Sequence, residues 1–285
     1  MLSYARFKFV DAVAKQDSAF PATVSIRRGD VHWTLRANCE ISALECLLRD
    51  PEGEIARQPA LLRDGWLVTI ARIAAAAGSN KSWLLRRINY GKPKAQLRDF
   101  FRAAAPIRAF RNALAFERNG FPTPRVIAAG IVRKFQRPIV GYLLVEELQP
   151  AWSLAEYLKI HRGMPHYAIQ NISRLVAALH TRGFVHGDLT VGNVLLDTKM
   201  QPWLVDLERA RSFARPVNWR GAVEEFFRFA RHVPVLGPGA RFGALRLLKL
   251  YCGERGWSGC EREFAADVLT RLKQKVKGYG QGQKA

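Results

Sequence analysis

Hydrophobic and polar residues alternate with a period of two in several segments of the first half of the chain, a pattern typical of half-buried strands. These segments are residues 23–37 and 60–89, and the mostly apolar runs 125–134 and 138–148 predict a further pair of strands. Turn-forming residues divide the first two of them into shorter runs: Arg28-Gly29-Asp30, Asp64-Gly65 and Gly78-Ser79-Asn80. Because such short turns join antiparallel neighbours, we expect an antiparallel sheet.

Other segments place apolar residues at helical spacing. Residues 40–50 predict a helix that stops at Pro51, and the basic stretch 94–119 predicts a helix interrupted at Pro106. After Pro150 the helical pattern takes over. The signals there are a capping box at Ser153 and Glu156, an amphipathic helix over 166–183 with Gly183 as its C-cap, further helices over 219–232 and 242–272, and a frayed tail from about 276.

Strand patterns therefore come first and helical patterns follow, with the hydrophobic connector YLLVEELQP (residues 142–150) between them. This order predicts an α+β fold of two lobes. We expect an antiparallel sheet in the N-terminal lobe and a mainly helical C-terminal lobe.

The composition excludes several classes of protein. With 285 residues, 48% of them hydrophobic, the chain has the length and apolar content of a globular protein and is not disordered. The four cysteines form no CxxC pair and no Cys/His cluster, so we interpret them as reduced thiols that hold no metal. No run of about 18 apolar residues occurs, and the first residues lack a signal-peptide core. We therefore expect a cytoplasmic protein.

The formal charge of +21 is the strongest compositional feature, and it is unevenly spread. Between Lys81 and Arg137 there are 14 Lys or Arg residues but only two acidic ones, Asp99 and Glu117. Such a field attracts phosphate groups, whether of nucleic acid, anionic lipid or a phosphorylated substrate. A solvated basic face is an equally good interpretation of the charge alone.

One segment, GFVHGDLTVGNVLLD at residues 183–197, sets polar residues at fixed spacing before an aliphatic run. A second apolar run ends at Asp206, 13 residues after Asn193. Phosphoryl transfer needs positioning and charge neutralisation from the protein. Asp188 suits the carboxylate that accepts the hydroxyl proton, Asn193 and Asp206 offer the oxygen ligands that Mg²⁺ prefers, and His186 would support the loop. The alternative is a polar turn in an unrelated fold.

These motifs resemble the protein-kinase-like fold, and more closely the bacterial lipopolysaccharide kinase family, the heptose and Kdo kinases of the inner core. The shared motifs follow the family's order over roughly residues 42–211: LLRDPEG, ALLRDGWLVTIARI, WLLRRIN, AFRNALAFERNGFPTPRVIAAG, YLLVEEL, GFVHGDLTVGNVLLD and WLVDLERAR. The segment NGFPTPRVIAAG is distinctive of this group. The resemblance implies transfer of the γ-phosphate of ATP to a sugar hydroxyl of the lipid-linked core, at the cytoplasmic face of the inner membrane.

The resemblance also implies the domain organisation. Residues 1–147 would form the N-terminal lobe, with a family-type extension over 1–60 and a nucleotide-binding part over 61–147. Residues 148–285 would form the helical C-terminal lobe with the catalytic loop. In that loop Asp188 matches the catalytic aspartate, whereas Asn193 and Asp206 match the metal ligands.

In the nucleotide-binding part, the resemblance implies that the backbone of the hinge, from Glu146 to Leu148, meets the adenine edge. Asp64 and Gly65 stand where a glycine-rich loop would cover the phosphates, although this loop has a single glycine.

Two departures from the family pattern concern the phosphate-binding lysine. Arg86 occupies the lysine position and keeps the positive charge on a larger, planar group. Ala109 stands where the glutamate partner is expected, and Glu117 lies two turns further on. Loss of both members of an ion pair leaves no buried charge without a partner. Leu207-Glu208 also replaces the usual Phe-Gly after Asp206, a variation that the family tolerates.

We therefore expect an ATP- and Mg²⁺-dependent kinase that phosphorylates a heptose or Kdo hydroxyl, peripheral on the inner face of the cytoplasmic membrane. Its expected partners are the lipid-linked core oligosaccharide and an anionic membrane surface. Two alternatives stay open: a nucleotide-binding pseudokinase scaffold, motivated by Arg86, and a kinase of a protein or another small alcohol. The absence of an Ala-Pro-Glu motif weighs against a regulated protein kinase. We expect no nucleic-acid partner, since nucleic-acid binding does not require Asp188, Asn193 and Asp206 at these spacings.

Overall fold

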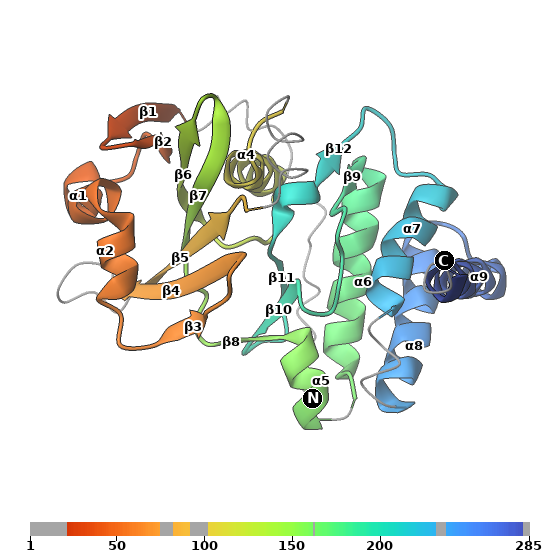
Figure 1. Ribbon diagram of the computed structural model, residues 1–285. Helices are drawn as coiled ribbons and strands as arrows, with labels where there is room; N and C mark the ends of the chain where they lie inside the picture. Colours follow the sequence, from red (N-terminus) through yellow and green to blue (C-terminus); the bar gives the residue numbers. More distant parts are fainter. Residues whose placement is uncertain (1–21, 75–81, 92–101, 162, 232–237, 282–285) are drawn as a thin grey trace.

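The N-terminal lobe is built on an antiparallel sheet of seven strands (Figure 1). The computed structural model describes residues 22–74, 82–91, 102–161, 163–231 and 238–281. The strands are β1 (Thr23–Arg28), β2 (Val31–Arg36), β3 (Leu61–Arg63), β4 (Val68–Ala74), β5 (Ser82–Asn89), β6 (Val126–Lys134) and β7 (Arg137–Glu146). Their order is β1-β2-β6-β7-β5-β4-β3, and all neighbours are antiparallel, as predicted.

Helices cover both faces of this sheet (Figure 1). Helices α1 (Ile41–Arg49) and α2 (Pro51–Ala56) pack on one face, where Trp33 of β2 donates a hydrogen bond from Nε1 to the carbonyl of Leu48 at 3.0 Å. Helix α4 (Ala105–Arg118) lies on the face toward the C-terminal lobe. Its Phe116 meets Phe184 of that lobe edge-on, with ring centroids 5.5 Å apart. Because α4 belongs to the core of both lobes, it fixes their contact.

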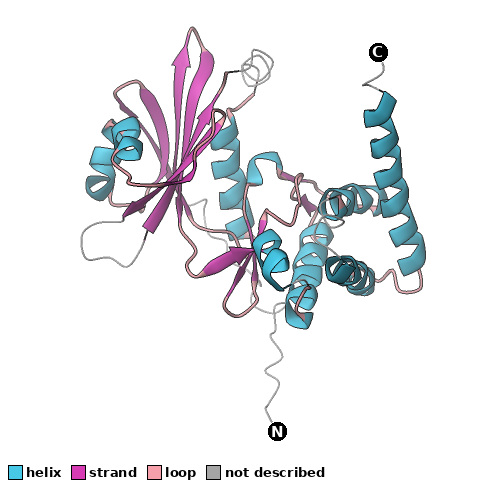
Figure 2. Cartoon of the chain, turned by 60° about the horizontal axis from the view of Figure 1, so that its bottom comes forward, coloured by secondary structure: helices cyan, strands magenta, loops and turns pink. Residues whose placement is uncertain are grey.

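The C-terminal lobe is mainly helical (Figure 2). Its helices are α5 (Leu154–His161), α6 (His166–Thr181), η1 (Leu207–Arg209), α7 (Trp219–Ala230), α8 (Pro238–Glu254) and α9 (Glu261–Gln281). Its short strands are β8 (Ala151–Ser153), β9 (Phe184–Val185), β10 (Val194–Asp197), β11 (Pro202–Leu204) and β12 (Arg211–Ser212). Apolar side chains from α6, α7, α8 and α9 form one core with α4. The two-lobed α+β architecture predicted from the sequence, with an antiparallel sheet in one lobe and mainly helices in the other, is therefore confirmed.

Local predictions agree with the structure where helix-end signals are strong. The capping box is formed: the Ser153 amide donates to Glu156 Oε2 at 2.9 Å, and the Glu156 amide donates to Ser153 Oγ at 3.1 Å. Gly183 follows α6 with φ +78°, a conformation that glycine adopts without strain. Among the described residues, no helix is long and apolar enough to span a bilayer.

Two predicted helix limits differ from the structure. Pro106 does not interrupt α4 but lies in its first turn, where a missing amide hydrogen costs nothing; residues 92–101 of the predicted basic helix lie outside the described residues. The tail predicted to fray from about 276 is helical to Gln281. The turn at Gly78-Ser79-Asn80 also lies outside the described residues.

Candidate functional site

His186 holds together the two segments that carry the predicted site residues. It follows β9, is fully buried, and its Nε2 lies 2.9 Å from the carbonyl of Val205, so Nε2 carries the proton. Its Nδ1 then accepts from the Asp188 amide at 3.3 Å. Burial lowers the pKa of His186, which keeps the ring neutral and suits both bonds. The ring thus joins the 186–193 loop to the residue before Asp206.

Glu225 of α7 anchors the same loop through two of its backbone amides. One carboxylate oxygen accepts from the His186 amide at 2.8 Å, and the other accepts from the Gly187 amide at 2.9 Å. The side chain is 2% exposed, and burial raises its pKa. The sequence analysis missed this residue. Its signal is an acidic residue among apolar positions on the buried face of an amphipathic helix, beside Ala222, Phe226 and Phe229.

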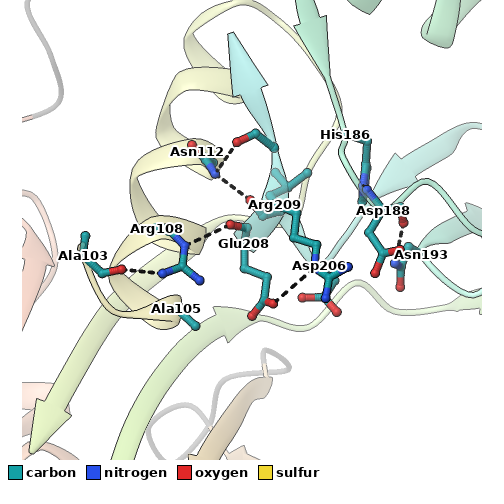
Figure 3. A network of polar contacts seen from close by, with 12 residues as sticks. Ala103, Ala105, Arg108, Asn112, His186, Asp188, Asn193, Asp206, Glu208 and Arg209 are labelled. Atoms are coloured by element: carbon teal, nitrogen blue, oxygen red, sulfur yellow. Dashed lines mark hydrogen bonds and ion pairs between the residues drawn. The ribbon is translucent and has the colours of Figure 1, made fainter. Parts of the chain in front are cut away.

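Asp188 lies between Asp206 and Asn193 in Figure 3, with His186 close by. Asn193 Nδ2 donates to the carbonyl of Asp188 at 2.9 Å, and the Asn193 carbonyl accepts from the Val205 amide at 3.1 Å. No described residue donates to Asn193 Oδ1, so this oxygen is available to a cation. Asp206 adopts a left-handed backbone conformation, φ 63° and ψ 51°, which turns the chain sharply after β11.

The donor set fits a magnesium ion held partly by a nucleotide. The described residues contain no group of three His, Cys, Asp or Glu side chains that would enclose a metal. One carboxylate and one amide oxygen, from Asp206 and Asn193, are what Mg²⁺ uses when phosphates and water complete its shell.

Helix α4 fixes the turn that follows Asp206 (Figure 3). Asn112 Nδ2 donates to the carbonyls of Leu207 at 2.7 Å and Ala210 at 3.1 Å. Arg108 Nε donates to the carbonyl of Glu208 at 3.3 Å. The sequence analysis missed both residues, because the partners lie about a hundred positions away in the chain and are backbone atoms.

Arg86 of β5 points at Asp206. Its Nη1 lies 2.7 Å from Asp206 Oδ1, and both side chains are largely buried, at 22% and 30% exposure. Arg86 Nε is buried without a hydrogen-bond partner in the described part of the chain. Glu117 is not its partner, since that carboxylate pairs with Arg36, and Ala109 is buried. The sequence analysis did not identify Asp206 as the partner of Arg86.

The side chain of Arg231 lies near Asp188, and the backbone of Arg209 lies against the neighbouring Gly187. Arg231, directly after α7, places Nη2 3.6 Å from Asp188 Oδ1 and is 44% exposed. The Arg209 carbonyl lies against Gly187, at a distance that leaves no room for a side chain there. The Arg209 side chain is 58% exposed, 3.9 Å from Glu208. A group that approaches Asp188 on this side therefore meets the Arg231 guanidinium.

The predicted hinge joins β7 to β8. The amides of Glu146 and Glu147 already donate to Arg125 and Ser82 carbonyls, at 2.8 and 2.9 Å. Both Glu147 oxygens are held by Arg72, at 2.7 and 2.8 Å. The Leu148 amide, by contrast, has no acceptor among the described residues. Within the predicted hinge, the Glu146 amide is therefore not available to a ligand.

The predicted phosphate-covering loop is the turn between β3 and β4. Asp64 and Gly65 lie in this turn, and the exposed Trp66 ring packs against Gly91 beyond the end of β5. Asn89 Nδ2 fixes the turn by donating to the Trp66 carbonyl at 2.6 Å. The turn thus closes over one end of the strand that carries Arg86.

Comparisons with known proteins agree with this geometry. Residues 78–233 match the lipopolysaccharide kinase (Kdo/WaaP) family. A 3-deoxy-D-manno-octulosonic acid kinase of Xanthomonas campestris pv. campestris (strain B100) is 32% identical over 123 residues, 42% of this chain and 45% of that protein. A kinase of the same name from Xylella fastidiosa (strain M12) is 32% identical over 101 residues, 35% of this chain and 39% of that protein. The matches thus span less than half of these relatives' length.

A solved structure described as WaaP in complex with acyl carrier protein superposes with a TM-score of 0.56. The superposition covers 86% of this chain and 98% of that one, at 18% sequence identity. At this identity the likeness shows a shared fold.

Proposed function

The chain belongs to the lipopolysaccharide kinase (Kdo/WaaP) family, and we propose that it transfers the γ-phosphate of ATP to a hydroxyl of a Kdo or heptose residue in the lipopolysaccharide inner core. The observation that carries the proposal is the arrangement of Asp188, Asn193 and Asp206 about one buried histidine (Figure 3).

Each residue has one role in this proposal. Asp188 accepts the proton of the attacking sugar hydroxyl, and His186 and Glu225 hold its loop in place. Asn193 Oδ1 and the Asp206 carboxylate hold Mg²⁺, which supplies charge neutralisation on the phosphates when bound. Leu148 meets the adenine edge, and the turn with Asp64 and Gly65 covers the phosphates.

Arg86 takes a double role in the proposal. In the absence of nucleotide its guanidinium neutralises Asp206 at 2.7 Å. With ATP and Mg²⁺ bound, the Asp206 carboxylate would hold the metal in place of Arg86, and the Arg86 guanidinium would meet the phosphates. An arginine offers a planar fork of donors that suits phosphate oxygens.

The acceptor is an anionic sugar. Arg231 stands beside Asp188, where a sugar hydroxyl must approach. Guanidinium groups recognise carboxylate or phosphate in pairs of hydrogen bonds, and a Kdo acceptor carries a carboxylate. Because this acceptor is linked to lipid, we place the protein on the inner face of the cytoplasmic membrane.

The test is phosphate transfer from γ-labelled ATP to purified inner-core acceptors, with the product position found by mass spectrometry. A Kdo-terminated and a heptose-terminated acceptor are compared, with and without Mg²⁺. One labelled phosphate on one of these sugars supports the proposal. ATP binding without transfer to any acceptor rejects it.

A second candidate function is a nucleotide-binding scaffold without turnover. The observation that favours it is the Arg86–Asp206 ion pair, because it occupies the proposed metal ligand. In that case Mg²⁺ adds nothing to the affinity for ATP, and Arg86→Ala does not reduce nucleotide binding. Both are measured by thermal shift with ATP alone and with ATP plus Mg²⁺.

A further inference from the structure

The turn between β6 and β7 holds an aromatic side chain in an unfavourable backbone conformation. Phe135 and Gln136 form this two-residue turn, with φ 49° and 63°. Turns that need positive φ at both positions favour Asn-Gly, and a bulky residue there is strained. The Phe135 side chain is 87% exposed, so no packing within the chain offsets the strain. An aromatic group held outward in this way indicates a contact outside the molecule.

Cations surround this aromatic ring. Arg133, Lys134 and Arg137 flank the turn, and all three are exposed. None of them has a carboxylate partner in the part of the chain that the structure describes; Arg133 Nη1 donates to the Gln136 carbonyl at 2.6 Å. The turn therefore presents one exposed aromatic side chain together with three positive charges that no carboxylate of the described residues neutralises.

The segment after the proposed metal site repeats this arrangement. Residues 211–215 carry the 53% exposed Phe213 between the exposed Arg211 and Arg215. The Phe213 amide donates to the Gly183 carbonyl at 2.8 Å, which fixes the backbone and leaves the ring outside. In Figure 1 the β6–β7 turn and β12 lie toward the same edge, the one away from β8. The two segments, one from each lobe, thus lie toward one edge in this view, and each carries an exposed phenylalanine within a basic cluster.

We propose that residues 133–137 and 211–215 dock the protein on an anionic membrane surface. Phenylalanine at the centre of a basic cluster suits the interface, because the ring enters the acyl boundary while the cations meet lipid phosphates. The inference rests on the proposed function for the choice of a membrane, since a lipid-linked acceptor lies there. Residues 211–215 begin with β12, whose Arg211 pairs with Val185 of β9, three residues before Asp188. Docking through them therefore brings the acceptor sugar and Asp188 together.

The experiment is co-sedimentation of the full chain with vesicles of phosphatidylcholine alone or mixed with phosphatidylglycerol, without ATP or acceptor. We expect binding to the anionic vesicles. Lys134→Glu changes the local charge by two and reduces the partition coefficient about 25-fold, from about fivefold per charge. Phe135→Asn and Phe213→Ser each reduce it about tenfold. Phe135→Asn should also raise Tm, because asparagine accepts the positive φ. Weaker vesicle binding together with a higher Tm would not result from the loss of a residue with a purely structural role.

Matched controls use the same substitutions elsewhere. Lys159→Glu on α5 makes the same charge change at an exposed position, and Phe242→Ser on α8 removes another exposed phenylalanine. Both should bind vesicles within twofold of the wild type. Equal losses of vesicle binding in the controls and the docking variants would overturn the proposal. So would equal binding of the wild type to both vesicle types, or displacement of the protein from anionic vesicles by an oligonucleotide at equal phosphate concentration. Phosphorylation of a delipidated, water-soluble acceptor is measured in parallel. The docking variants should phosphorylate it at the rate of the wild type, which distinguishes a failure of docking from a failure of the kinase assignment.

Discussion

Glu225 is the residue whose loss should damage the site most without touching a substrate. Its carboxylate accepts the His186 and Gly187 amides at 2.8 and 2.9 Å and is 2% exposed. A buried amide left without an acceptor costs about 1–3 kcal/mol, so removal of both bonds in Glu225→Ala costs about 2–6 kcal/mol. In Glu225→Gln the amide oxygen still accepts one bond, while the NH₂ group faces the other donor. We therefore expect a loss of about 1–3 kcal/mol for Glu225→Gln.

The change is visible in two assays. For a chain of this size a loss of 1 kcal/mol lowers Tm by about 2–4 °C. A loss of about 1–3 kcal/mol should therefore make Glu225→Gln unfold about 2–12 °C below the wild type in calorimetry. Its kcat should fall about 100-fold, because a shift of about 1 Å in the position of a reacting group costs that much.

The control is Glu224→Gln, which removes the same charge one position earlier from a side chain that is 32% exposed and pairs with Arg271. An exposed pair contributes about 0–1 kcal/mol, so Glu224→Gln should stay near the wild type in both assays. If the two glutamine variants unfold and turn over alike, the anchoring role of Glu225 is wrong.

Three further changes test separate parts of the molecule. Asp206→Ala should abolish the Mg²⁺-dependent part of the thermal shift by ATP; a shift that keeps its Mg²⁺ dependence contradicts the assignment of this ligand. Arg86→Lys should retain ATP affinity within about fivefold of the wild type, because it loses one charge-assisted bond of about 1 kcal/mol. Arg86→Ala should weaken ATP affinity more than tenfold, and equal affinities of the two variants would assign the phosphates to another residue. Burial lowers the pKa of His180 to about 3, whereas the unfolded value is about 6.5. As the pH falls, this histidine is protonated in the unfolded chain before it is protonated in the folded chain. On the order of 3 kcal/mol of the free energy of unfolding is therefore lost between pH 7 and pH 4. Denaturant titrations at several pH values should show a smaller loss for His180→Gln than for the wild type. An unchanged dependence of the free energy of unfolding on pH would contradict this role of His180.

Much of the fold follows from local signals in the sequence. The mostly apolar runs at 125–134 and 138–148 predict two strands and form β6 and β7, and the capping box at Ser153 begins α5 where expected. The motif at 183–197 also fixes the order of His186, Asp188 and Asn193, because their spacing is set within one short loop.

What the sequence did not predict depends on contacts between distant segments. Arg86 meets Asp206 across 120 positions, and His186 meets Glu225 across 39. These pairs exist because α4 and α7 pack where they do, and packing is a property of the whole core rather than of any local pattern. Pro106 shows the same limit at short range, since only the packing of α4 decides whether a proline begins a helix or breaks it.

The most direct test of the kinase assignment compares the wild type with Asp188→Asn. Labelled phosphate transfer from ATP to the inner-core acceptor and ATP–Mg²⁺ affinity are measured on the same samples. Loss of a general base costs about 100- to 10,000-fold, so we predict that transfer by Asp188→Asn falls at least 100-fold while nucleotide affinity stays within about threefold of the wild type. Transfer at a rate close to that of the wild type would contradict the proposed site and the reaction assigned to it.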